Sequence, residues 1–418
     1  MIARLAYRAL WPLLTPLLKR YLRKRARQAP AYLEHWDERF GRDLPRSTGG
    51  EVIWLHAVSV GETRAALPLV KLLRQQYPAA RLVITQMTPT GRATALELYP
   101  EAEIRYLPYD RAGSVRRFIA ALRPRFGVLM ETELWPNLLH ACRDAGVPLF
   151  LLNARLSEKS LRGYRRIGPL IRPALRALSA VAAQSEADAE RLRQLGAANV
   201  RVCGNSKYDF TPPAEQLALG QAFRQRIGQR PVWVCASTRD GEEALILQAW
   251  QAAPRGDALL LIVPRHPERF DNVATLAADM GFAVQRRSDG LPLAATTDVW
   301  LGDSMGELFA YYAAADVAFV GGSLLDFGAQ NLIEPASVGL PVLLGPSTYN
   351  FAEAASLALA AGAARQVSDA AALVAAALVL LQDAPARQAM RAAGLAFTAQ
   401  HRGASQRMLQ LIAGQLAG

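Results

Sequence analysis

The chain has 418 residues, of which 51% are hydrophobic and 20% are charged, and it carries a formal net charge of +12. This composition is ordinary for a folded protein, and the length excludes a single core and favours two domains of about 200 residues each. The three cysteines and five histidines are widely spaced and form no metal-ligand pattern. We therefore expect buried thiols in a reducing compartment, no metal site and no other bound cofactor.

The positive charge is concentrated at the start of the chain. Eight Lys and Arg residues precede the first acid, Glu34, so the first 30 residues carry +8 and the remainder only +4. The apolar run 9–18 is about half the roughly 20 residues that span a bilayer, and its main basic cluster follows the run, unlike a cleavable signal. With Trp11 in this run, residues 1–30 are predicted to lie as an amphipathic segment on an anionic membrane surface.

A solvated basic tail and a nucleic-acid-binding arm are the alternatives for this segment. No RNA-binding signature accompanies the charge, and the aromatic residues are not interleaved with it. We therefore expect no nucleic-acid partner.

Short apolar runs alternate with longer amphipathic runs along the chain, which predicts βαβ units and parallel sheets. The strands are expected at 52–56, 82–86, 104–107, 126–130, 148–152, 180–183, 200–203, 232–236, 259–263, 283–285, 299–301, 317–320 and 342–344. Helical patterns include 64–76, 114–122, 370–381 and 405–416. The sequence Thr211-Pro212-Pro213 is a linker signal, so the domains are predicted at 31–211 and 212–418.

Glycine turns follow predicted strands in both halves, at 56–62 and at 321–334. Ligands of open α/β sheets bind outside the carboxyl ends of the strands, so two such turns favour a two-domain enzyme with a cleft between the halves. A carboxylate such as Glu334 can bind both hydroxyls of a ribose, and glycines let the backbone approach a phosphate. This pattern is that of a nucleotide-sugar site in outline.

Acidic and basic side chains at strand ends of the first half are candidates for chemistry. Glu62 is either a first-turn acid stabilised by the helix dipole or a general base for a sugar hydroxyl, and its position alone does not decide. Glu131 and Glu133 follow the strand 126–130, and they either cap a helix or orient a substrate or a nearby cation. Lys207 is either a surface lysine or a cation that offsets negative charge in a transition state.

Two turns of the second half carry candidate donor ligands. Arg265 follows an apolar strand, where an arginine is a natural partner for phosphate. The turn 302–307 has a similar place in the sequence, and its backbone amides could contact a base edge or a phosphate.

At these motifs the chain closely resembles the 3-deoxy-D-manno-octulosonic acid (Kdo) transferases of lipopolysaccharide biosynthesis. The matching segments are 56–62, 87–91, 131–137, 153–157, 263–270, 302–307 and 321–334. The resemblance implies the GT-B glycosyltransferase architecture, in which two Rossmann-like domains with parallel sheets face each other across a cleft. It also implies a CMP-Kdo donor, the lipid A precursor lipid IVA as acceptor, and attachment to the cytoplasmic face of the inner membrane of a Gram-negative bacterium.

The resemblance also implies roles for individual residues. Glu62 matches the catalytic base, and Glu131 and Lys207 match transition-state stabilisers. The CMP-contacting positions match Pro264, Arg265, Met305, Gly306, Glu307, Asn331, Leu332, Ile333 and Glu334. Gln330 occupies a position where the family often has histidine, so a proton-transfer role for that side chain is not expected. Direct attack by the acceptor hydroxyl, with Glu62 as base, implies inversion.

Two other functions stay open on the sequence. Another GT-B transferase that uses a UDP-sugar in cell-envelope synthesis would need a similar nucleotide site. A catalytically silent membrane-bound scaffold would not need the carboxylates at three strand ends. The sequence does not predict the number of Kdo residues transferred, the oligomeric state or the acyl-chain preference.

Overall fold

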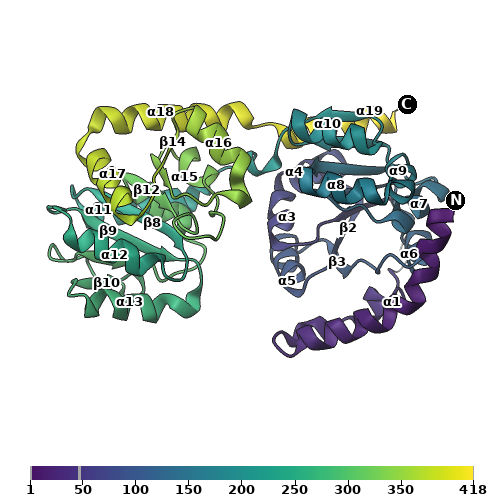
Figure 1. Ribbon diagram of the computed structural model, residues 1–418, viewed down its shortest axis with the longest axis horizontal. Helices are drawn as coiled ribbons and strands as arrows, with labels where there is room; N and C mark the ends of the chain where they lie inside the picture. Colours follow the sequence, from purple (N-terminus) through teal and green to yellow (C-terminus); the bar gives the residue numbers. More distant parts are fainter. Residues whose placement is uncertain (1, 46–48, 418) are drawn as a thin grey trace. The chain divides into compact units, whose positions relative to one another are not determined.

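The structure, a computed structural model, describes residues 2–45 and 49–417 and divides the chain into two compact units (Figure 1). Unit 1 comprises the residues up to Phe210 together with those from Arg402 onward, and unit 2 comprises Thr211–His401. Each unit is an α/β layer structure built on a parallel sheet. The ends of the predicted domains at residues 1 and 418, and residues 46–48, lie outside the described part of the chain.

Within the described residues, unit 1 contains a seven-stranded parallel sheet with the order β3-β2-β1-β4-β5-β6-β7. The strands are β1 (Val52–His56), β2 (Arg81–Gln86), β3 (Glu103–Tyr106), β4 (Phe126–Met130), β5 (Leu149–Ala154), β6 (Ala180–Ala183) and β7 (Val200–Val202). The central strands are buried along their whole length, as expected for a parallel sheet that is covered on both faces. Gly127 in β4 is required by this packing, since a Cβ there would lie 2.6 Å from the Trp54 ring.

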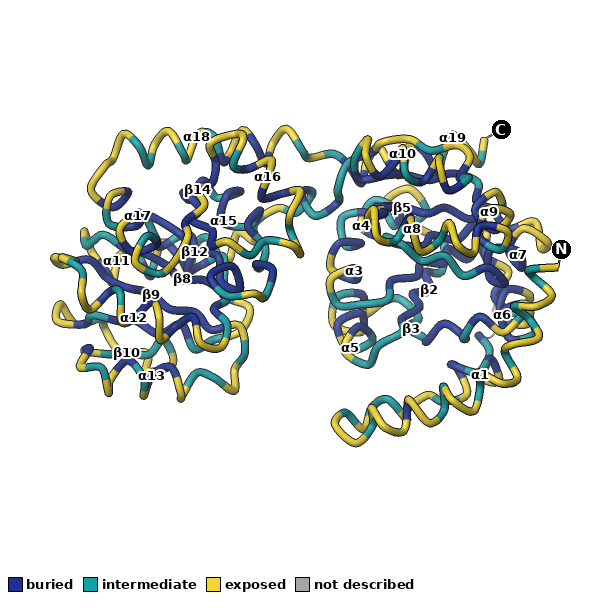
Figure 2. Tube along the Cα trace, in the orientation of Figure 1, coloured by how far each residue is buried: buried dark blue, intermediate teal, exposed yellow. Residues whose placement is uncertain are grey.

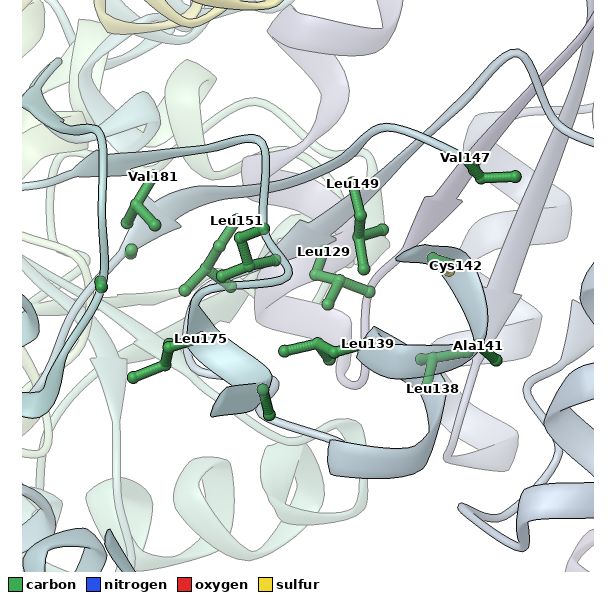
Figure 3. Close-up of a cluster of buried hydrophobic side chains, with 14 of the residues drawn as sticks. Leu129, Leu138, Leu139, Ala141, Cys142, Val147, Leu149, Leu151, Leu175 and Val181 are labelled. Carbon is green, nitrogen blue, oxygen red and sulfur yellow. The ribbon is translucent and has the colours of Figure 1, made fainter. Parts of the chain in front are cut away.

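Helices cover both faces of this sheet and bury two apolar clusters. One face packs against α6 (Ala112–Leu122), α7 (Pro136–Asp144), α8 (Glu158–Arg166), α9 (Gly168–Leu175) and α10 (Glu186–Leu195). Figure 3 shows part of this layer, where Leu129, Leu149 and Leu151 of the sheet meet Leu139 of α7 and Leu175 of α9. The other face packs against α4 (Leu67–Gln76), α5 (Pro89–Leu98) and α19 (Ala404–Leu416).

Unit 2 repeats this plan, and its described strands form a seven-stranded parallel sheet with the order β10-β11-β9-β8-β12-β13-β14. The strands are β8 (Val232–Thr238), β9 (Leu259–Pro264), β10 (Val284–Arg286), β11 (Val299–Leu301), β12 (Val317–Val320), β13 (Val342–Leu344) and β14 (Ala364–Gln366). One face packs against α12 (Glu242–Ala252), α13 (Phe270–Asp279) and α17 (Ala370–Gln382), and the other against α11 (Ala214–Ile227) and α14 (Leu308–Ala314). The unit also contains α15 (Ile333–Ser337), α16 (Ala352–Ala360) and α18 (Ala384–His401).

The predicted strands are all present, and their ends match the structure or differ by at most two residues. The strand β14 was not predicted, because this edge strand has three residues and two of them are exposed. The prediction that α19 belongs to the second domain is wrong. The helix returns to unit 1 because its apolar stripe, Met408, Leu411 and Ile412, is buried in the core of that unit. Asp209 fixes this return by accepting hydrogen bonds from the backbone N–H groups of Gly403 and Ser405.

The basic N-terminal segment forms α1 (Ile2–Ala26), which the structure groups with unit 1. Its first turns are held by hydrogen bonds from Tyr7 Oη to Asp110 (3.0 Å) and from Arg8 to Asn137 (3.3 Å). Figure 2 shows α1 exposed along much of its length, and Leu13 and Leu17 are 70% and 63% exposed. Of the helices in the described residues, none is by itself long and apolar enough to cross a membrane, and only the bent run of α17 with α18 and α19 passes by length and composition.

Candidate functional site

Glu62 lies in the first turn of α3 (Val60–Ala65), directly after β1. Ser59 caps this helix by accepting the Glu62 N–H, and the Glu62 carboxylate accepts from Val58 N–H at 2.8 Å and from Ser59 Oγ at 3.0 Å. Burial raises the pKa of Glu62 to about 7, against these hydrogen bonds and with a contribution from the nearby Glu131. The structure thus makes Glu62 a helix-start acid whose carboxyl titrates near neutrality, where a general base works best.

Glu131 and Lys207 come together beside Glu62, as their interactions with its carboxyl indicate. Lys207 Nζ lies 3.5 Å from Glu131 Oε1, and both side chains are about one-fifth exposed. Glu131 directly follows β4 and has a left-handed backbone with φ of 59°, a conformation that is uncommon outside glycine and often marks a functional site.

The end of β5 holds the turn that carries Lys207. Asn153, also left-handed at φ 53°, accepts the Ser206 N–H through Oδ1 at 3.0 Å. Asn205 accepts the Lys207 N–H at 3.0 Å and so caps the short 3-10 turn η2 (Ser206–Tyr208). These side-chain-to-backbone bonds fix the position of the lysine relative to the sheet.

Glu133 is a third carboxyl in this group, and the structure joins it to Trp135 and His56. Trp135 Nε1 donates to Glu133 Oε2, and His56 Nε2 lies 4.0 Å from the same oxygen. Burial raises the pKa of Glu133 to about 7, against the hydrogen bond from Trp135 and with a contribution from the charges of Glu62 and Glu131. Burial also lowers the pKa of His56 to about 4, so this imidazole is neutral at physiological pH.

In unit 2 the predicted ligand residues follow β9, β11 and β12, whose carboxyl ends share one edge of a parallel sheet. Arg265 N–H donates to Thr238 O at 3.0 Å, and the arginine side chain is exposed. Pro264 is buried at the end of β9. Gly321 is required here, because a Cβ would lie 2.4 Å from Ser237 O. The backbone at this strand end therefore comes close to the neighbouring strand.

The turn after β11 and the helix α15 carry the remaining predicted residues. Asn331 Nδ2 donates to Glu334 Oε1 at 3.0 Å and so orients that carboxylate. Glu307 accepts from Arg287 (3.2 Å) and from Ser304 Oγ. Met305 is 57% exposed, and Gly306 has φ of 81°.

Three neighbouring positions contribute backbone rather than reactive side chains. Leu332 and Ile333 are buried, so a ligand at these positions would contact their backbone atoms rather than their side chains. Gln330 N–H donates to Gly321 O at 3.0 Å, and its side-chain amide lies next to Gly322. Gln330 is therefore held beside the glycine turn by its backbone, with its side-chain amide next to that turn.

The sequence analysis missed two fully buried carboxylates that brace this part of unit 2. Glu242 accepts hydrogen bonds from the N–H groups of Gly322 (2.7 Å), Leu324 (2.9 Å) and Arg239 (2.8 Å). Glu243 forms a bidentate ion pair with Arg269 at 2.8 and 3.0 Å. The signal that could have revealed them is the acidic run that follows the strand at 232–236.

Comparisons with known proteins give the chain its family. Residues 34–210 match the family described as 3-deoxy-D-manno-octulosonic-acid transferase (kdotransferase). The 3-deoxy-D-manno-octulosonic acid transferase of Bordetella pertussis is 45% identical over 96% of this chain and 96% of its own length. That of Haemophilus influenzae is 37% identical over 98% of both chains.

Among solved structures, a UDP-GlcNAc 2-epimerase from Neisseria meningitidis covers 87% of this chain and all of its own, with a TM-score of 0.60 and 16% identity. This similarity shows the fold, which is GT-B with two Rossmann-like domains. The similarity to the two transferases extends over nearly the whole chain and is much higher. The chain therefore belongs to the family of 3-deoxy-D-manno-octulosonic acid transferases and is a glycosyltransferase.

Proposed function

We propose that this glycosyltransferase transfers Kdo from CMP-Kdo to lipid IVA, with inversion at the anomeric carbon. The observation that carries the proposal is the 45% identity to a Kdo transferase over 96% of both chains. The reaction takes place at the cytoplasmic face of the inner membrane of a Gram-negative bacterium.

In this proposal unit 1 binds the acceptor and provides the base. The acceptor hydroxyl gives its proton to Glu62 while its oxygen forms a bond to the anomeric carbon of Kdo, and the bond from that carbon to the CMP phosphate oxygen breaks. A carboxyl with a pKa near 7 matches this task, because it is partly ionised at neutral pH and still basic enough to accept the proton. Lys207 and its partner Glu131 stabilise the charge that develops as the bonds change.

Unit 2 binds the donor through the residues at the ends of β9, β11 and β12. Glu334, oriented by Asn331, accepts hydrogen bonds from the ribose hydroxyls. Arg265 pairs with the phosphate, for which its exposed side chain is open to solvent. The other residues proposed to contact CMP are Pro264, Met305, Gly306, Glu307, Leu332 and Ile333.

The helix α1 provides the membrane contact in this proposal. It combines exposed leucines, among them Leu13 and Leu17, with the eight cations of the first 30 residues. Apolar side chains enter the interface, while Lys and Arg attract anionic lipid headgroups.

Mass spectrometry of the product formed from CMP-Kdo and lipid IVA tests the function directly. We expect lipid IVA to gain the mass of one or more Kdo residues. The matching nucleotide test is thermal unfolding, in which CMP should raise the melting temperature more than UMP does. No mass increase with active controls, or stronger protection by uridine nucleotides, would favour a UDP-sugar transferase instead.

A further inference from the structure

His56, at the end of β1, has a buried ring nitrogen that lacks a hydrogen-bond partner. Its Nδ1 lies 3.0 Å from both Thr85 O and Thr85 Oγ1. The carbonyl oxygen can only accept and the hydroxyl can also accept, so a proton on Nδ1 satisfies both contacts. The Nε2 atom therefore presents a lone pair. It makes no hydrogen bond within the described residues, although the side chain is fully buried. Such an unpaired buried acceptor is costly and calls for a donor.

Glu133 is the group that faces this lone pair, with Oε2 at 4.0 Å from Nε2. An ionised carboxylate would oppose one lone pair with another, whereas a protonated carboxyl can donate to Nε2 and still accept from Trp135 Nε1. A small movement of the glutamate side chain would shorten the distance to that of a normal hydrogen bond, about 2.7 Å.

The neighbouring groups decide which carboxyl keeps a proton. Glu62 and Glu133 repel each other when ionised, so one of them is protonated more readily than the other. Glu62 has two donors, Val58 N–H and Ser59 Oγ, which favour its charged form. Glu131 is paired with the Lys207 ammonium at 3.5 Å.

Burial and the charges of Glu62 and Glu131 favour the neutral form of Glu133, whereas the hydrogen bond from Trp135 favours the charged form. Among the described residues, Tyr164 of α8 also faces Glu133, and its own pKa is raised first by burial and then by this carboxyl. Tyr164 therefore offers no positive charge to Glu133.

We propose that Glu133 is a positioning residue that holds a proton against His56 Nε2 and thereby leaves Glu62 as the ionised base. This inference rests on the proposed function, because it assigns the protons of the same site. The neutral Glu133 removes a negative charge from the neighbourhood of Glu62. Because it is neutral, Glu133 also does not compete with Glu131 for the charge of Lys207.

The first experiment measures the protonation of the His56 ring nitrogens in the absence of substrate. Histidine-selective ¹⁵N labelling of the full chain gives signals from five residues, and the His56 signals are those absent from His56→Asn. If that variant does not fold, replacement of the other four histidines one at a time assigns them by elimination. We expect Nδ1 to be protonated and Nε2 to be deprotonated, with an Nε2 shift that changes as Glu133 loses its proton, at a higher pH than the acid limb of turnover.

In Glu133→Gln the amide donates permanently, so the Nε2 shift should no longer depend on pH. A proton on Nε2, a wild-type shift that does not change with pH, or the same titration in Glu133→Gln would each overturn the proposal. These outcomes are independent of whether the protein transfers Kdo.

The second experiment compares the pH dependence of turnover in Glu133→Gln and in Glu190→Gln, a control at an exposed position of α10. The Glu133 variant should keep most of its turnover at pH 8. The midpoint of its acid limb should stay at the wild-type pH, because glutamine is neutral, as the protonated Glu133 is while Glu62 ionises. The control should show the wild-type profile.

A loss of more than about 100-fold at every pH would instead identify Glu133 as the base. A fall of the midpoint by about one pH unit would show that Glu133 is ionised and repels Glu62 in the wild-type protein. Either result refutes the positioning role.

Discussion

Unit 1 and unit 2 both place acidic residues at the carboxyl ends of a parallel sheet, and they treat the charge in different ways. In unit 1, Glu62 and Glu133 are partly buried and titrate near pH 7. In unit 2, Glu242 and Glu243 are fully buried, and burial raises the pKa of Glu242 too, but backbone N–H groups bind Glu242 and Arg269 pairs with Glu243. Arg265 meanwhile extends into solvent. In the proposed mechanism, Glu62, with two donors, takes the proton, whereas Glu242, which accepts from several backbone N–H groups, holds the loop after β12.

The largest expected effect is that of Glu62→Gln, which keeps the shape of the side chain but cannot accept a proton. We expect kcat to fall by about 10²- to 10⁴-fold, as is typical for loss of a general base, while CMP affinity stays near normal. A single-turnover assay at saturating donor and acceptor measures this.

The matched control for Glu62→Gln is Asp188→Asn, because Asp188 has the same helix-start contacts with Ser185 on α10. The control should lose stability and keep its turnover. Near-wild-type turnover in Glu62→Gln would mean that the carboxyl serves only the helix, and the proposed difference between the two units would then be wrong.

The second expected effect is a pH dependence in which activity and stability move in opposite directions. Turnover should fall by about tenfold per pH unit below pH 7, as Glu62 becomes protonated. The pKa values of Glu62 and Glu133 are raised from 4.5 to about 7, so the folded state binds more protons than the unfolded state in this window. The free energy of unfolding should therefore decrease as the pH rises from about 4.5 to 7.

Turnover and denaturant unfolding, each followed from pH 5 to pH 8, provide the measurement. In Glu62→Gln the stability slope should be shallower than in the wild type. A steep rise of stability with pH across this window would contradict the raised pKa values.

The third effect is smaller and concerns unit 2. Glu334→Ala should weaken CMP binding by about 1.5–3 kcal/mol, the range for hydrogen bonds to a charged group. Calorimetry with CMP measures it, with Glu215→Ala at an exposed position of α11 as the control. Wild-type CMP affinity in Glu334→Ala would show that this carboxylate does not bind the ribose.

The smallest effect is expected at α1. This helix belongs to unit 1 and provides the proposed contact with lipid, which unit 2 lacks in the proposal. The double variant Leu13→Ser/Leu17→Ser removes apolar side chains that face solvent, so the fold should be unaffected. Binding to anionic vesicles in a sedimentation assay should weaken by about tenfold or more, because less apolar area enters the interface.

Leu96→Ser, another exposed leucine of unit 1, is the control for the α1 variant. Equal vesicle binding by the double variant and the wild type would contradict the anchor.

Much of the fold was predictable because parallel strands that are buried on both faces read as continuous apolar runs, as in 126–130 and 317–320. The return of α19 to unit 1 was not predictable, because the apolar stripe of a helix does not indicate which core the helix packs against. Glu62, Glu131, Lys207 and Glu334 could be singled out from motifs at strand ends. The acidic run after the strand at 232–236 indicates Glu242 but not its role, because that role depends on a loop 80 residues away.

The sequence by itself determined the alternation of strands and helices, the glycine turns at strand ends and the family to which the chain belongs, since these are written in local pattern and in similarity to relatives. Only the tertiary structure decided that Glu62 and Glu133 titrate near neutrality and that Lys207 lies 3.5 Å from Glu131. The physical reason is that burial and the approach of charges come from residues distant in the chain. A carboxyl in a sequence has its ordinary pKa until the folded protein removes water from it and brings other charges near.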